Sequence, residues 1–143
     1  MLFRSRAAVE GLDDQQLDTP YRDGGWSVRQ VTHHVPDSHL HAYCRTKYAI
    51  TEDHPTVKPY DENAWAMLAD AREPIAASLA ILDGVHKRWV TVLRNLKPTD
   101  FARTWFHPEK GETLRVDDLL AIYSWHGRHH VAHIKSLRQR RSW

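Results

Sequence analysis

The strongest constraint on the fold lies near the C-terminus, where a long helical pattern carries histidines among its apolar residues. Four of the chain's eleven histidines fall between His126 and His133. The apolar residues that recur at helical spacing in this segment are Val116, Leu119, Ile122, Tyr123, Ile134 and Leu137. A helix with such a stripe buries it against other helices, so the pattern favours a helical bundle.

Helical phase separates these histidines into two groups. At about 100° per residue, His126 and His130 fall inside the apolar stripe, His133 lies at its edge and His129 lies further out. Residues four apart stack on one helical face, so both imidazoles of such a pair can reach the same point. Buried imidazoles need polar partners, and neutral imidazole is the commonest metal ligand. The pair therefore indicates either two core imidazoles that hydrogen-bond to polar neighbours or a metal site inside the bundle, with His129 and His133 at its rim or behind its ligands.

A second helix, at residues 27–51, offers the partner ligand. Its apolar stripe consists of Val28, Val31, Val35, Ala42 and Ala49. His39 sits on this stripe, His34 lies on its flank, and His33 is expected to point to solvent. Pro36 should kink the helix, which makes the phase uncertain beyond one turn. Periodicity alone therefore allows either His34 or His39 as a third ligand.

The remaining sequence completes a single all-α domain over residues 1–143. We expect a shortened N-terminal helix at residues 2–12, a loop at 13–25, a short helix at 61–68, a long helix at 73–96 and a last helix at 117–139. Residues 101–116 alternate around His107-Pro108 and Gly111, which predicts a small extended excursion or hairpin before the last helix. The expected architecture is a four-helix bundle.

Composition narrows the possible partners. The chain is 41% hydrophobic and 27% charged with a net charge of +2, which gives no reason to expect a nucleic-acid or membrane partner. No apolar run approaches the length that spans a membrane, so a cytoplasmic location is expected. The single cysteine, Cys44, excludes an internal disulfide framework and a cysteine-rich zinc motif.

Several motifs, in order along the chain, resemble those of the DinB/YfiT-like metalloenzyme superfamily, and of its YfiT branch in particular. The first is GGWSVRQVTHHV at residues 24–35, followed by Asp37, Ser38 and His39. The others are TEDHPTVKPYDENAW at 51–65, HKRW at 86–89, FHPE at 106–109 and WHGRHHVAHI at 125–134. The resemblance extends over about residues 13–143, and it departs from the family at Pro36 and in the short N-terminal helix.

The resemblance implies a four-helix bundle that holds one divalent metal ion, zinc or nickel, by three histidines. Carried onto this chain, the ligands are His34, His126 and His130. The choice of His34 over His39 comes from the resemblance, whereas helical phase selected the other two. The implied activity is that of a metal-dependent hydrolase acting on a small-molecule substrate, and the family implies a possible homodimer.

Three nitrogen ligands with open positions are typical of a catalytic metal site. Asp37, one turn from His34, is a weak candidate for a general base, and Tyr43, Tyr60, Trp65 and Trp89 are candidates to line a pocket. The chain has no H-E-x-x-H motif and no paired E-x-x-H motifs, which argues against a zincin protease and a di-iron oxidase. Two alternatives are transfer of a low-molecular-weight thiol to an electrophile and a metal-binding module without catalysis.

Overall fold

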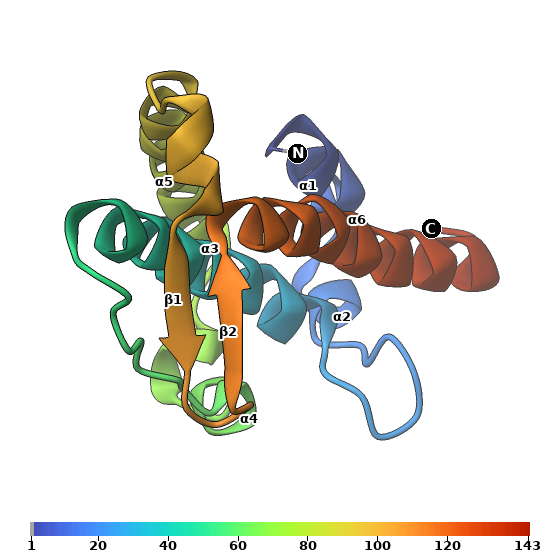
Figure 1. Cartoon of the computed structure of the whole chain (residues 1–143). Helices are drawn as coiled ribbons and strands as arrows, with labels where there is room; N and C mark the ends of the chain where they lie inside the picture. The colour runs from blue at the N-terminus through green and yellow to red at the C-terminus, as the bar shows by residue number, and fades with distance from the viewer. Residues whose placement is uncertain (1) are drawn as a thin grey trace.

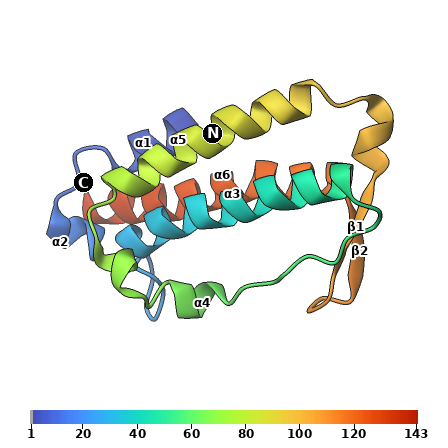
Figure 2. The ribbon, with the colours of Figure 1, turned by 90° about the vertical axis from the view of Figure 1, so that its left-hand side faces the viewer.

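Two long helices, α3 (Val28–Thr51) and α6 (Val116–Arg141), run side by side in opposite directions through the molecule (Figures 1 and 2). Helix α5 (Ala76–Arg94) packs on α3, and the short α1 (Leu2–Val9) contacts both α5 and α6. The computed structural model describes residues 2–143. These four helices form the bundle that the sequence predicted.

Short elements connect the bundle helices. A β-hairpin precedes α6, as predicted, and pairs β1 (Thr104–His107) antiparallel to β2 (Glu112–Arg115). Gly111 closes its turn with φ +65°, a conformation that glycine adopts without strain. The connector after α3 joins the hairpin, because Phe106 N–H donates to Pro55 O at 2.9 Å and Val57 N–H donates to Phe106 O at 3.0 Å. The other elements are α2 (Asp14–Leu17), α4 (Glu62–Trp65), and the 3₁₀ turns η1 (Ala69–Arg72) and η2 (Pro98–Ala102).

Two local predictions differ from the structure. The expected loop at residues 13–25 contains α2, which Asp13 caps by accepting the N–H of Gln16 at 2.8 Å. The expected helix at 61–68 is only the single turn α4, and the 3₁₀ turn η1 follows it. Helix α3 runs from Val28 to Thr51 with Pro36 inside it. Its N-terminus has a capping box between Ser27 and Gln30.

The core divides into two hydrophobic clusters along α3 and α6. One cluster joins the C-terminal half of α3 and the N-terminal half of α6 to α5 and the hairpin, and it includes Ala42, Trp89, Trp105 and Tyr123. The other joins the opposite halves of the same helices to α1 and α2, and it includes Val31 and Ile134. A middle segment between the clusters is left for polar side chains.

Two side chains lie on different faces from those predicted. His33 is buried rather than solvent-facing, because its ring is held between Ser78 Oγ at 2.7 Å and Glu73 O at 2.9 Å. Ile122 was assigned to the apolar stripe of the last helix, yet 40% of it is exposed. No helix in residues 2–143 has the length and hydropathy needed to cross a bilayer.

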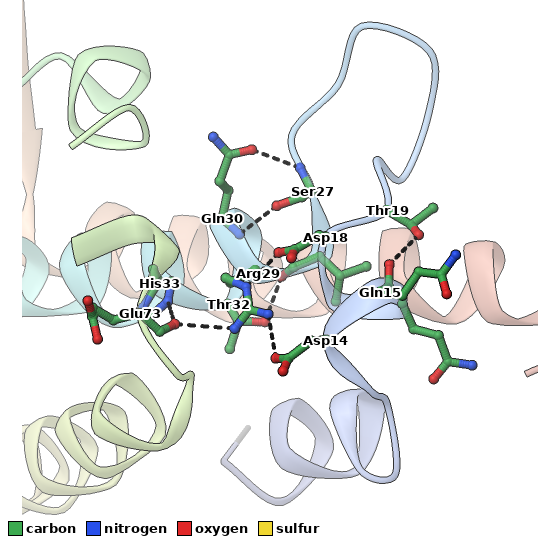
Figure 3. Close-up of polar contacts among 12 residues, drawn as sticks. Asp14, Gln15, Asp18, Thr19, Ser27, Arg29, Gln30, Thr32, His33 and Glu73 are labelled. Carbon is green, nitrogen blue, oxygen red and sulfur yellow. Dashed lines mark hydrogen bonds and ion pairs between the residues drawn. The ribbon is translucent and has the colours of Figure 1, made fainter. Parts of the chain in front are cut away.

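Arg29 connects the N-terminal elements to the bundle (Figure 3). Only 7% of its side chain is exposed, and it pairs with Asp14 at 2.7 Å and Asp18 at 2.6 Å, both at α2. A third nitrogen donates to Glu73 O at 3.4 Å, just before α5. One buried cation therefore ties α2, α3 and the entry to α5 together.

Replacing Arg29 should destabilise the fold more than removing either of its acidic partners. Arg29→Ala loses charge-assisted hydrogen bonds and buried packing, and should lower the free energy of unfolding by about 2 kcal/mol. Asp14→Asn should cost less than about 1 kcal/mol, because Asp14 is 89% exposed and rehydrates. Urea unfolding would measure both, with exposed Lys87→Ala as the control. Equal effects of the Arg29 and Lys87 substitutions would contradict this assignment.

Candidate metal centre

Three histidines converge in the middle segment between the two hydrophobic clusters. His34 comes from α3, and His126 and His130 come from α6. The Nε2 atom of His126 lies 3.3 Å from Nε2 of His34 and 3.2 Å from Nε2 of His130. One ligand atom from each ring lies within 4.8 Å of the other two, so the group could hold a metal ion.

The spacing of these nitrogens fits the chemistry of a metal ligand set. Zinc–nitrogen bonds of about 2.05 Å at a tetrahedral angle place neighbouring nitrogens about 3.3 Å apart. The two measured Nε2 separations, 3.3 and 3.2 Å, match this value. Neutral imidazoles that turn lone pairs toward one point repel each other, and a shared cation would remove that repulsion.

The surroundings keep the three rings neutral. Burial lowers the pKa of His34 to about 4, with a further contribution from His126. Burial likewise lowers the pKa of His126 to about 4, with a smaller effect of His129. For His130, burial and then its histidine neighbours lower the pKa to about 2. Near neutral pH all three rings are therefore in the form that binds metal.

His39, the alternative third ligand that periodicity left open, lies outside this group. It is fully buried, and its Nδ1 contacts Nε2 of His86 on α5 at 2.6 Å. Its ring centre is 5.7 Å from that of His126. The Nε2 atom of His39 and the Nδ1 atom of His126 are both buried without a hydrogen-bond partner. His39 is thus placed behind a ligand candidate rather than among the ligands.

These unpartnered atoms have a consistent proton arrangement. A metal bound at Nε2 of His126 fixes the ring proton on Nδ1, which then needs an acceptor. No hydrogen bond joins these two atoms in the structure, so the rings would have to approach for His39 Nε2 to become that acceptor, with the proton of His39 on Nδ1 and donated to His86. His130 has a similar arrangement, because its buried Nδ1 and the buried Ser5 Oγ both lack partners and line one small pocket of about 20 Å³. That volume suits a single bridging water.

The three rings open onto a cavity with a volume of about 720 Å³. Helix α3 contributes Ser38 and Arg45 in addition to His34, and α6 contributes Tyr123 and Trp125. The remaining walls come from the loop before α3, the connector at Tyr60 and the hairpin at His107. The cavity is therefore bounded by bundle helices on one side and by connecting segments on the other.

The other predicted site residues are distributed around this cavity. Asp37 lies instead in an adjoining pocket of about 20 Å³ that it shares with His34 and Trp65, and burial raises its pKa. Tyr60 lines both spaces, whereas Tyr43 and Trp89 belong to the hydrophobic core. The candidate pocket aromatics are thus divided between wall and core.

His129 and His133 form a second pair on the cavity wall. Their Nε2 atoms are 2.9 Å apart, so one ring donates its proton to the other. Trp125 stacks on His129 with ring centres 4.4 Å apart, and Tyr21 stacks on His133 at 4.4 Å. Together with their places in the cavity wall, these contacts put both histidines beside the three-histidine group.

Sequence reasoning missed three polar residues of the wall. Ser38 and Tyr123 share a buried hydrogen bond of 3.0 Å, and Arg45 lies further along the same face of α3. Ser38 and Arg45 lie four and eleven residues after His34, a helical spacing that could have identified these two residues. His107 belongs to the hairpin, whose docking no local pattern reveals.

The metal-free protein should lose stability when it is acidified. The unfolded chain takes up protons near pH 6.5, while the rings of His34 and His126 stay neutral to about pH 4 in the folded state. Protons therefore favour the unfolded state across this interval, by about 1.4 kcal/mol per pH unit for each ring. Thermal melting in chelator from neutral pH to about pH 4 would measure the loss. His34→Leu should make the decline shallower, and a constant melting temperature would contradict the prediction.

Comparison with known proteins places this geometry in a family. The DinB superfamily matches residues 3–134. A Bacillus mycoides protein named "Putative metal-dependent hydrolase" is 55% identical over 136 residues, which cover 95% of this chain and 78% of that protein. A Bacillus cereus protein with the same descriptive name is 54% identical over the same shares of both chains.

Solved structures agree with these relatives. YfiT from Bacillus subtilis, described as "a probable metal-dependent hydrolase with an unusual four-helix bundle topology", superposes with a TM-score of 0.97 at 45% identity and covers 99% of this chain and 82% of its own. The mycothiol-dependent maleylpyruvate isomerase shares the fold at a TM-score of 0.72 and 15% identity, over 93% of this chain and 55% of its own. The chain belongs to the DinB superfamily.

Proposed function

We propose that the protein is a metal-dependent hydrolase that binds one divalent ion, zinc or nickel, through His34, His126 and His130. The observation that carries this proposal is the convergence of three neutral imidazoles, with Nε2 separations of 3.3 and 3.2 Å, at the wall of a 720 Å³ cavity. The relatives named as metal-dependent hydrolases support it. A metal ion in such an open site supplies Lewis acidity toward water or a carbonyl oxygen.

The chain's own residues would hold and orient a small-molecule substrate. The cavity is large enough for such a ligand, and Tyr60 and Trp125 provide aromatic surface in its wall. The Ser38–Tyr123 hydrogen bond gives the wall a fixed polar point one helical turn from His34. The His129–His133 pair places two further ring nitrogens on the same wall.

The two alternative functions differ from hydrolysis in measurable ways. The likeness to the mycothiol-dependent isomerase, at 15% identity, supports a common fold and carries no thiol chemistry to this chain. Thiol transfer would require a thiol for turnover and would give a conjugate without addition of water. A non-catalytic module would bind the metal and turn over neither esters, amides nor thiol-plus-electrophile mixtures.

Substitution of one proposed ligand should abolish metal binding. We expect His130→Gln, purified without a metal column and incubated with zinc or nickel, to lose the single metal equivalent of the wild type. His133→Gln is the matched control, since it removes a histidine one turn further along α6 and should keep the metal. Elemental analysis after gel filtration measures both. Absence of stoichiometric metal from the wild type, even after reloading, would contradict the proposal.

Turnover should depend on the same substitution. Metal-loaded wild-type protein should hydrolyse members of an ester and amide panel, and His130→Gln should lose this activity, whereas His133→Gln keeps its metal for comparison. Incorporation of labelled oxygen from water, followed by mass spectrometry, separates hydrolysis from thiol conjugation. Product that forms only with added thiol, and without labelled oxygen, would replace the hydrolase by the transferase.

His39 should tune metal affinity without binding the metal. His39→Leu removes the imidazole whose ring centre lies 5.7 Å from that of His126 and which could accept from Nδ1 once a metal orients the rings, so it should weaken zinc binding by about 10- to 100-fold. His39→Gln retains an acceptor oxygen and should recover part of the loss. Zinc competition titrations measure the affinity, and melting of the metal-free variants shows whether the fold is intact. Wild-type affinity in a folded His39→Leu protein would contradict the role.

A further inference from the structure

Arg45 lies in the wall of the 720 Å³ cavity, and most of its hydrogen-bond donors have no partner among the described residues of the protein. Its Nη2 atom makes one long contact to Lys58 O at 3.5 Å, and its Nε atom is buried with no partner. None of the ion pairs in the described part of the chain involves it. Arg103, in contrast, donates to two carbonyl oxygens at 2.6 Å each. Arg45 therefore retains unused hydrogen-bonding capacity.

The guanidinium of Arg45 is nevertheless held in place. It stacks over Trp105 of β1, with the guanidinium carbon 5.6 Å from the ring centre, and Trp105 is almost fully buried. The hydrogen bond of Arg45 described above uses Nη2, which leaves the donors on Nη1 for a ligand. A cation fixed on an aromatic face with an open edge is suited to binding an oxyanion.

Arg45 and the histidine group lie at two separated positions along one face of α3. Arg45 follows His34 by eleven residues, with Ser38 between them, and all three line the cavity. Eleven residues of helix rise about 16 Å. Both side chains lean toward the N-terminus of α3, and the longer arginine reaches further back than His34, which leaves a gap on the order of 10 Å.

The buried and partly buried titratable groups around Arg45 are neutral, so none of them balances its positive charge. Burial lowers the pKa of His41 and of His107, and the charge of Arg45 lowers both further. Burial raises the pKa of Tyr60 to about 12, so its hydroxyl stays protonated and can donate. The remaining charged wall residues near the connector and hairpin, Glu62, Glu109 and Lys110, are exposed.

We propose that the substrate of this cavity carries a carboxylate that binds Arg45, on the order of 10 Å from the bond held at the three histidines. A planar guanidinium matches a carboxylate and forms charge-assisted hydrogen bonds with it. Lys110 offsets one of the two exposed carboxylates, Glu62 and Glu109, and the other opposes additional negative charge, which favours a singly charged carboxylate over a doubly charged phosphate. This inference rests on the proposed function for the histidine end of the cavity and adds the substrate class.

The test uses zinc-loaded protein and two probes with the same carbon chain, suberic acid monohydroxamate and the methyl ester of its carboxyl group. The hydroxamate group of each probe binds zinc, and only the acid offers a carboxylate at the other end. Calorimetry on the wild type should show the acid binding about tenfold more tightly than the ester. This comparison needs no variant, so it does not depend on the folding of a mutant. Equal affinities would overturn the proposal.

Three variants assign the preference to Arg45. Arg45→Gln should bring the acid-to-ester ratio near one, and Arg45→Lys should give an intermediate ratio because it keeps the charge but loses the planar fork. Arg128→Gln, an exposed arginine of α6 outside the cavity wall, should leave the ratio unchanged. A ratio that persists in folded Arg45→Gln would overturn the role of this residue. Tighter binding of a phosphonate-terminated hydroxamate of equal length would overturn the choice of carboxylate.

A metal-free measurement separates this inference from the proposed function. Suberate added to metal-free protein should shift the side-chain Nε–H resonance of Arg45 in a ¹H–¹⁵N spectrum, and Arg45→Gln identifies that resonance by its loss. If neither hydroxamate binds the zinc-treated protein while suberate still shifts the Arg45 signal, the metal site fails and the carboxylate site stands. If both hydroxamates bind equally and the signal does not move, the carboxylate site fails and the metal site stands.

Discussion

The contact between His34 of α3 and His126 of α6 joins residues that are 92 positions apart in sequence. It requires two long helices to meet at a polar level, where each would otherwise bury aliphatic side chains. The two hydrophobic clusters on either side supply the packing that holds the helices at this level. Desolvation by the same packing keeps the imidazoles neutral, so the metal-binding form and the folded form favour each other.

Polar groups in this middle segment are arranged in layers. The Nε2 atoms of His34, His126 and His130 face one another, whereas the buried Nδ1 atoms of His126 and His130 have no hydrogen-bond partner within the described chain. The His39–His86 contact links the buried histidines of α3 to α5. Buried polar groups are costly when unpaired, so a metal bound as proposed would stabilise the unpartnered nitrogens by fixing their protons.

Much of the fold and part of the site could be predicted from the sequence, because helical periodicity reports which residues face a core. Periodicity placed His126 and His130 on one inward face and Val28, Val31 and Val35 in the core, where the structure has them. It failed for His33, since a partner on α5 and a carbonyl before that helix satisfy the buried ring. It could not choose between His34 and His39, because that choice depends on how α3, α5 and α6 pack together. The position of Arg45 in the cavity wall could not be predicted, because it depends on the hairpin that places Trp105 against its guanidinium.

The hairpin and the connector it pairs with form one wall of the cavity, while the three histidines belong entirely to α3 and α6. Insertions or substitutions in that wall would therefore alter ligand choice without touching the helices that fix the histidines. Reactivity and selectivity are thus separable traits in this architecture. A common bundle could diversify into many enzymes by changing short connecting segments, each retaining the same central chemistry.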